Sequence, residues 1–198
     1  MAKLTLDDIV DVRAYERERD DFRRRVIALK KRRRVLVGPI MSFVFENRET
    51  IRFQIQEMAR VERLLSDEAV EIELRTYNPL IPDPGELCAT MLIELTSDEQ
   101  QRHWKPLLVG LLDRICLRVG AGDRTLALGA RIEDSHAQML TRDVPPSVNF
   151  VRWRLGPEAV AAFACGPVTL VIDHESYRHE TTLADATVDE LLRDLRGS

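Results

Sequence analysis

The chain has 198 residues, of which 44% are hydrophobic and 31% are charged. This balance is typical of a globular protein and is too apolar for an intrinsically disordered chain. The formal net charge of -4 argues against a general role in binding polyanions.

No segment of the sequence predicts export or insertion into a membrane. The longest apolar stretches, such as residues 107–112, are far shorter than the ~20 residues that a membrane helix needs. Residues 1–8 become acidic at once and lack the apolar stretch of a signal peptide. The cysteines, Cys88, Cys116 and Cys165, are widely spaced, so neither a disulfide framework nor a cysteine zinc site is expected. We therefore expect a cytoplasmic protein with reduced thiols.

One long helix is predicted over residues 13–34. The apolar side chains of Tyr15, Phe22, Val26 and Leu29 recur at helical spacing and form one stripe. Acidic residues lie early in this segment and basic residues lie late, which suits the helix dipole at both ends.

Two strands and two further helices are predicted before residue 80. The segments 35–37 and 40–46 have extended apolar patterns. Asn47 is a suitable cap for a helix over 48–65, and a second helix follows over 66–78.

Predicted strands dominate the chain after residue 86. The clearest is 86–95, where every second residue is apolar and should face the core: Leu87, Ala89, Met91, Ile93 and Leu95. Thr96-x-x-Glu99 is a capping-box pattern that predicts the start of a short helix. The remaining predicted elements are a hairpin over 115–130, a loop over 131–146, strands over 148–155 and 168–172, and helices over 157–164 and 184–195.

These elements predict an α+β fold in which a largely antiparallel, strongly twisted sheet packs against N-terminal helices. About six or seven strands are expected, and such a sheet can curl toward a barrel or a sandwich. No linker or internal repeat divides the chain. We therefore expect one domain over 1–198, with a mainly helical part at 1–80 and a mainly β part at 81–198.

Three unusual stretches of sequence carry a resemblance to a known family. They are ALKKRRRVLVGP at 28–39, then FENRET, FQIQEM and TYNPLIP within 45–82, and DHESYRHE at 173–180. The chain resembles, over its whole length, the bacterial family catalogued as domain of unknown function 3501. This resemblance implies no activity and no catalytic residue. It implies that the gene lies near rubrerythrin-like and iron–sulfur oxidoreductase-like genes, and hence that the protein works in a redox or peroxide-stress context.

A basic run ends the first predicted helix and is a candidate contact for an anion or an acidic partner. The run spans residues 30–34, and the candidate contact residues are its last three, Arg32, Arg33 and Arg34. The same cations would also suit the solvated last turn of a helix. Because no aromatic residues interleave with the run for base stacking, we expect at most weak nucleic-acid binding and favour a protein partner.

The second candidate site is a polar set at the junction between the second predicted strand and its helix. Glu46, Asn47, Arg48 and Gln54 hydrogen-bond in several directions, so they would line a ligand pocket or hold the junction in a buried network. We favour the network, with Arg48 paired to a carboxylate through its planar fork.

The third candidate is a divalent-metal site made by Asp173, His174, His179 and Glu180. Its spacing matches no standard motif such as H-E-x-x-H. Histidines at a strand end more often satisfy local hydrogen bonds. We expect His174, Tyr177 and His179 to share one face if a turn separates the first from the other two.

These observations favour a non-catalytic accessory or interaction protein over an enzyme. The sequence lacks the fingerprints of nucleophile elbows, phosphate loops and dinucleotide sites. The competing hypothesis is a metal-dependent enzyme centred on residues 173–180. No cofactor is strongly implied, and a homo-oligomer is compatible with the sequence.

Overall fold

The computed structural model describes residues 2–132 and 145–197. The described helices are α1 (Val12–Arg33), α2 (Arg48–Glu62), α3 (Asp67–Tyr77), α4 (Asp98–Leu107), α6 (Pro157–Cys165) and α7 (Asp185–Arg196). The described strands are β1 (Arg34–Val37), β2 (Met41–Phe45), β3 (Glu86–Ile93), β4 (Ile115–Val119), β5 (Leu126–Gly129), β6 (Arg131–Ile132), β7 (Val148–Arg154), β8 (Val168–His174) and β9 (Tyr177–Thr182).

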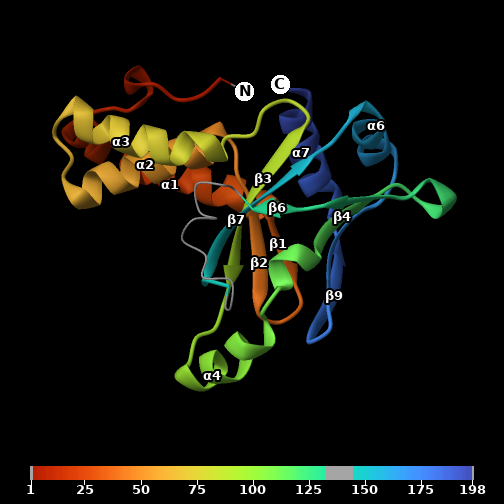
Figure 1. Ribbon diagram of the computed structural model, residues 1–198. Coiled ribbons are helices and arrows are strands. Elements are labelled where there is room, and N and C mark those ends of the chain that lie inside the picture. Colours follow the sequence, from red (N-terminus) through yellow and green to blue (C-terminus); the bar gives the residue numbers. More distant parts are fainter. Residues whose placement is uncertain (1, 133–144, 198) are drawn as a thin grey trace.

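The strands form two antiparallel sheets. Five strands pair in the order β1-β2-β3-β7-β6, and four pair in the order β5-β4-β8-β9. In Figure 1, α1, α2 and α3 lie together on one side of the five-stranded sheet, whereas α6, α7 and β9 lie on the other. The predicted α+β fold is confirmed. The described strands are divided between two sheets instead of one sheet of six or seven, and they form no closed barrel.

A shared hydrophobic core joins the two sheets. The predicted inward face of β3 is confirmed, because Leu87, Ala89, Met91 and Ile93 are buried in this core. The four-stranded sheet contributes alternating apolar residues from β4 and β8 to the same core. Leu95 lies beyond the end of β3 and is only partly buried.

The opposite face of the five-stranded sheet is covered only in part. Ile51 and Ile55 of α2 pack there against Cys88 of β3 and Phe150 of β7, in a second core cluster. Farther along the sheet, apolar side chains stay exposed; for example, Val148 of β7 is 44% exposed. The boundary between covered and uncovered sheet is where the candidate site lies.

Two predicted elements differ in detail from the structure. Helix α4 begins one residue later than the capping-box pattern suggested, because the Ser97 side chain, and not that of Thr96, accepts the hydrogen bond from the Gln100 amide. The predicted loop over 131–146 contributes the short strand β6, and residues 133–144 lie outside the described residues. Among the described residues, no helix has the length and apolarity to cross a membrane.

A partly buried polar clamp joins α1 to α2. The Glu57 carboxylate accepts one hydrogen bond from the Tyr15 hydroxyl, at 2.7 Å, and two from the Arg19 guanidinium, at 2.8 and 2.9 Å. The bonded guanidinium of Arg19 is the main reason that the pKa of Glu57 is lowered from its ordinary value of 4.5 to about 2. The ionised carboxylate therefore stabilises the folded chain.

Replacing Ile93 by Ala should lower the free energy of unfolding by about 2–5 kcal/mol, because the change opens a cavity between the sheets. Leu36→Ala is the matched control: this side chain is 59% exposed, and its loss should change stability by less than about 0.5 kcal/mol. Urea denaturation measures both. Equal losses for the two variants would show that the core face of β3 is wrongly placed.

Glu57→Gln should cost roughly 2–3 kcal/mol at pH 7, because the ionised state of Glu57 is favoured in the folded chain. The folded pKa lies below the unfolded one, so this stabilisation is complete above about pH 4.5 and is lost as the pH falls toward about 2. The stability difference between parent and variant should therefore shrink across that window. Glu62→Gln, an exposed site on the same helix, should show neither effect. A difference that stays constant with pH would contradict the proposed clamp.

Candidate functional site

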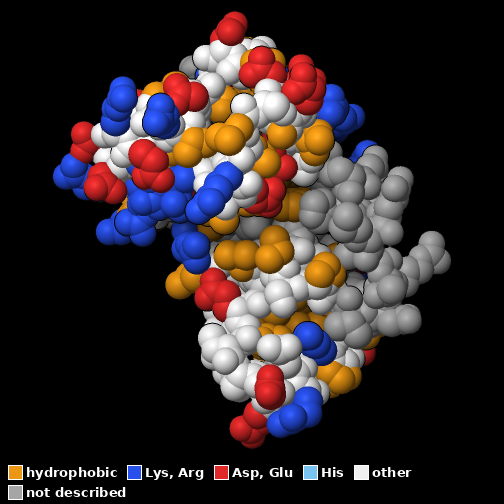
Figure 2. All heavy atoms as spheres, turned by 90° about the vertical axis from the view of Figure 1, so that its left-hand side faces the viewer, with side chains coloured by type: hydrophobic (Ala, Val, Ile, Leu, Met, Phe, Trp, Pro, Cys, Tyr) orange, Lys and Arg blue, Asp and Glu red, His pale blue; other side chains and the backbone are white. Residues whose placement is uncertain are grey.

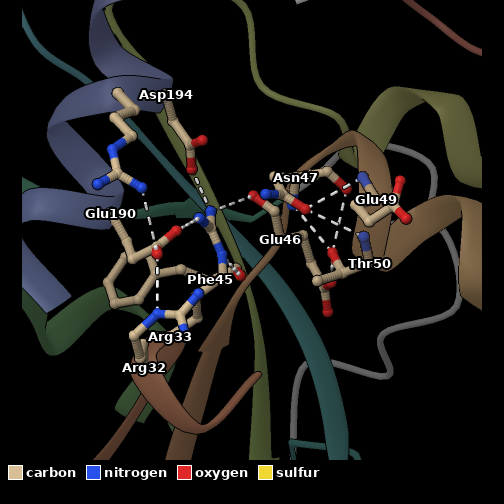
Figure 3. A network of polar contacts seen from close by, with 10 residues as sticks. Arg32, Arg33, Phe45, Glu46, Asn47, Glu49, Thr50, Glu190 and Asp194 are labelled. Carbon is tan, nitrogen blue, oxygen red and sulfur yellow. Dashed lines mark hydrogen bonds and ion pairs between the residues drawn. The ribbon is translucent and has the colours of Figure 1, made fainter. Parts of the chain in front are cut away.

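The junction between β2 and α2 is held by a reciprocal cap. The side-chain oxygen of Asn47 accepts hydrogen bonds from the amides of Glu49 and Thr50, at 3.1 and 3.0 Å. In return, the Thr50 hydroxyl oxygen accepts from the Asn47 amide at 2.9 Å. Figure 3 shows these contacts beside Glu46, at the point where the chain leaves the sheet. The cap fixes the first turn of α2.

Glu46 places a carboxylate in the interior beside this cap. Its side chain is buried, with 6% of the residue surface exposed. The Thr50 hydroxyl donates to one carboxylate oxygen at 2.5 Å, and the Thr90 hydroxyl of β3 donates to the other at 2.6 Å. Within the described chain, Glu46 has no ion pair. Two hydroxyl donors thus orient the carboxylate without neutralising its charge.

The two other residues predicted for this network lie apart from it. Arg48 points toward the N-terminal segment, where it pairs with the Asp8 carboxylate at 2.6 Å and donates to the Ala2 carbonyl. The pKa of Asp8 is lowered, first by its hydrogen bond with the Thr5 backbone and then by Arg48. Gln54 lies one helical turn beyond Thr50 and faces the pocket described next. The expected carboxylate partner of Arg48 is therefore present, but outside the junction.

A pocket of about 380 Å³ opens over the five-stranded sheet, beside the first turns of α2 and the last turn of α3. We call it the sheet–helix pocket. Its polar lining comes from Lys30, Arg34, Glu46, Gln54, Tyr77 and Thr90. Its apolar lining comes from Val44, Ile51, Leu80, Leu92, Val148 and Phe150. Figure 2 shows this side of the molecule, where hydrophobic side chains are exposed between the helices and the lower part of the sheet, next to basic side chains.

The pocket is lined on the side of α3 by the partly buried Tyr77. Burial raises the pKa of the Tyr77 hydroxyl, the Glu73 carboxylate adds to the rise, and the Gln54 side chain opposes it. Tyr77 is therefore a neutral hydroxyl, able to donate or accept a hydrogen bond, at physiological pH.

The basic run does not form one anion-binding surface. Arg32 pairs with Glu190 of α7 at 2.8 Å, and Arg34 pairs with Glu94 at 3.3 Å on the edge of the sheet. Arg33 is completely buried and is therefore inaccessible to an incoming anion. These three side chains point in different directions because successive helical positions lie about 100° apart and Arg34 already belongs to β1.

Arg33 joins three elements at the back of the junction (Figure 3). Its guanidinium donates to the carbonyls of Phe45 and Glu46, at 2.8 and 3.1 Å, and to the Asp194 carboxylate of α7. A second α7 carboxylate, that of Glu190, lies 3.7 Å from the same guanidinium. Burial raises the pKa of Asp194, and the charge of Arg33 opposes that rise. The orientation of Glu46 thus depends on a contact with the C-terminal helix.

The predicted metal ligands do not converge. Strands β8 and β9 form a hairpin in which His174 pairs with Tyr177 and Asp173 with Arg178. His174 and His179 lie on one face of this hairpin and Asp173 and Glu180 on the other, because side chains alternate along a strand. The two carboxylates are already paired with Arg178 and Arg118. Across the described residues, no three potential ligands come close enough to hold a metal ion.

The side chains on the histidine face of this hairpin make hydrogen bonds and ring contacts within the protein. As expected, His174, Tyr177 and His179 share one face. The Ser176 amide donates to His174 Nδ1 at 3.3 Å, so Nε2 carries the proton and donates to the Val109 carbonyl at 2.9 Å. The Tyr177 hydroxyl donates to the Val37 carbonyl at 2.7 Å, and its ring lies 4.5 Å from that of His179. The hydrogen bond from Tyr177 of β9 to Val37 of β1 joins the two sheets.

Several residues of the site were not singled out by sequence reasoning. Thr90 had one signal, since it is a polar residue on the outer face of an otherwise apolar strand. Lys30 was hidden among the other cations of the basic run. Nothing local to Glu190 or Asp194 indicated a buried partner in α1.

Replacing Arg33 by Met should lower the free energy of unfolding by about 3–5 kcal/mol, because it leaves buried carboxylates and carbonyls without their donor. Arg32→Met is the matched control, since this neighbour also pairs with Glu190 but is exposed, and its loss should cost less than about 1 kcal/mol. Chemical denaturation gives both values. Similar losses would show that the buried pair does not organise the junction.

Comparisons with known proteins agree with the resemblance noted in the sequence. A crystal structure described as a novel protein of unknown function from Burkholderia pseudomallei K96243 matches with a TM-score of 0.90 and 33% identity, over 98% of this chain and 100% of that one. No curated protein matches the chain. The family model described as "Protein of unknown function (DUF3501)" matches residues 3–195. The chain therefore belongs to the DUF3501 family.

Proposed function

We propose that this chain is a non-catalytic binding protein that holds a small organic molecule in the sheet–helix pocket. The observation that carries this proposal is a pocket of about 380 Å³ on a half-covered sheet face, within the usual range of ~300–1,000 Å³ for ligand sites. Apolar walls with a few placed polar groups are the usual composition of such sites.

The polar groups of the pocket suit recognition better than proton transfer. Both oxygens of Glu46 already accept short hydrogen bonds from threonine hydroxyls, which hold the carboxylate as a fixed acceptor. The neutral hydroxyl of Tyr77 and the amide of Gln54 add directional contacts on the side of the helices.

We further propose that the protein has an accessory role, in which it acts together with a partner protein. A ligand-holding protein without its own chemistry acts by presenting or sensing its ligand beside a partner protein. Two cations of the basic run, Arg32 and Arg34, are paired with acids of this chain, which counts against a nucleic-acid partner. A partner of the rubrerythrin or iron–sulfur type stays a prediction from the family resemblance.

The proposal is tested with 1-anilinonaphthalene-8-sulfonate, a fluorescent probe with an apolar body and one anionic group. We expect saturable binding to one site. Leu92→Trp, which fills the pocket, should weaken that binding at least tenfold. Leu36→Trp is the control, because Leu36 is exposed on a neighbouring strand outside the pocket.

Equal binding by the Leu92→Trp variant would show that the probe does not occupy the pocket. Fluorescence that rises without saturation would indicate binding to exposed apolar surface in general. Either result would contradict the proposed function.

A further inference from the structure

Two opposite charges line the sheet–helix pocket, and neither has a partner of opposite charge within the part of the chain that the structure describes. Lys30 of α1 is half-buried, and among the described residues its ammonium makes no ion pair or hydrogen bond. Glu46 is buried and accepts only the two threonine hydroxyls. Each of these groups keeps unused capacity for a charged hydrogen-bond partner.

Three arginines close to Lys30 in the chain differ from it, because each of them has an ion pair. Arg32, Arg33 and Arg34, which follow Lys30 closely along the chain, each pair with a carboxylate of this protein. A charge that is partly removed from water without a counterion is costly, and a bound ligand of opposite charge offsets that cost. Among the described residues, the three arginines are thus paired with carboxylates, whereas the lysine of the pocket is not.

We propose that the pocket binds a small zwitterion with an apolar side chain, of the kind that an aliphatic α-amino acid provides. The ligand ammonium binds the Glu46 carboxylate, the ligand carboxylate binds Lys30, and the side chain packs on the apolar walls near Leu92 and Val148. This inference rests on the proposed binding function and names the ligand class of the same site.

The charge pattern decides between ligand classes. A simple carboxylic acid would neutralise Lys30 but would place apolar or like-charged atoms against Glu46. A simple amine would leave Lys30 unpaired in the same way. A neutral apolar molecule would desolvate both charges, and only a zwitterion satisfies the two together.

L-Leucine and two truncated analogues test the inference. Isoamylamine lacks the carboxylate of leucine, and 4-methylpentanoate lacks its ammonium group. Titrations of the full chain, followed by amide chemical shifts and by calorimetry, should show leucine binding roughly ten- to hundredfold more tightly than either analogue, because each analogue loses one charged contact.

Two variants should respond in a crossed pattern. Glu46→Gln should weaken leucine and isoamylamine but leave 4-methylpentanoate unchanged. Lys30→Met should weaken leucine and 4-methylpentanoate but leave isoamylamine unchanged. The matched controls are Glu49→Gln and Lys31→Met, which lie next to the site in sequence and do not line the pocket. Both controls should bind leucine like the parent.

If apolar contact alone drives binding, the two analogues will bind as tightly as leucine. That result would overturn the inference but would leave the proposed function standing. The inference would likewise be overturned, and the proposed function would stand, if the protein binds the naphthalene probe in the pocket but does not bind leucine. Failure of the probe experiment itself would instead remove the proposed function.

A last measurement excludes self-neutralisation of the pocket. If Lys30 turned onto Glu46 in the free protein, the two variants would be coupled in stability. We expect their effects on the free energy of unfolding to add in the absence of ligand, as they do for independent sites. Strong coupling would overturn the inference, because the chain would then supply its own counterion.

Discussion

The buried guanidinium of Arg33 is the contact on which the rest of the site depends. It lies where α1 ends and β1 begins, and it binds the carbonyls at the end of β2 and the Asp194 carboxylate of α7. A charge with no exposure to water has to be paired and hydrogen-bonded. Three acceptors from two other segments bind Nε and Nη2 of Arg33, and Nη1 lies 3.7 Å from the Glu190 carboxylate. This contact holds Glu46 in place, and with it the start of α2.

The half-covered sheet explains why a pocket forms at this place. The strands of the five-stranded sheet are apolar on both faces near α2, as Cys88 and Phe150 show, and the helices cover them there. Beyond the first turns of α2 and the last turn of α3, no helix among the described residues covers the same sheet, and Val148 is exposed. Apolar sheet surface, helix ends and the charges of Lys30 and Glu46, which have no ion pair among the described residues, therefore meet at one boundary.

The second sheet is tied to the first through a tight turn. Gly38 adopts a positive φ of 68°, and a Cβ at this position would overlap the Tyr177 hydroxyl and the His179 ring. The same hydroxyl accepts from the Ile40 amide and donates to the Val37 carbonyl. The polar segment at the end of β8 and in β9 thus helps to join the two sheets. This role accounts for its many histidines and carboxylates, which form no metal site among the described residues.

The sequence by itself determined the elements and the faces that follow from a local repeat. Side chains repeat their direction every 3.6 residues in a helix and every 2 residues in a strand, and such repeats can be recognised within one stretch of sequence. They predict the apolar stripe of α1, the inward face of β3 and the common face of His174 and Tyr177. Tertiary structure alone decided which charges would be paired. Arg33 meets Asp194, 161 positions later in the chain, whereas Lys30, one turn earlier on the same helix, meets no acid among the described residues. Pairing depends on which distant segments pack against each face, and no local pattern encodes that.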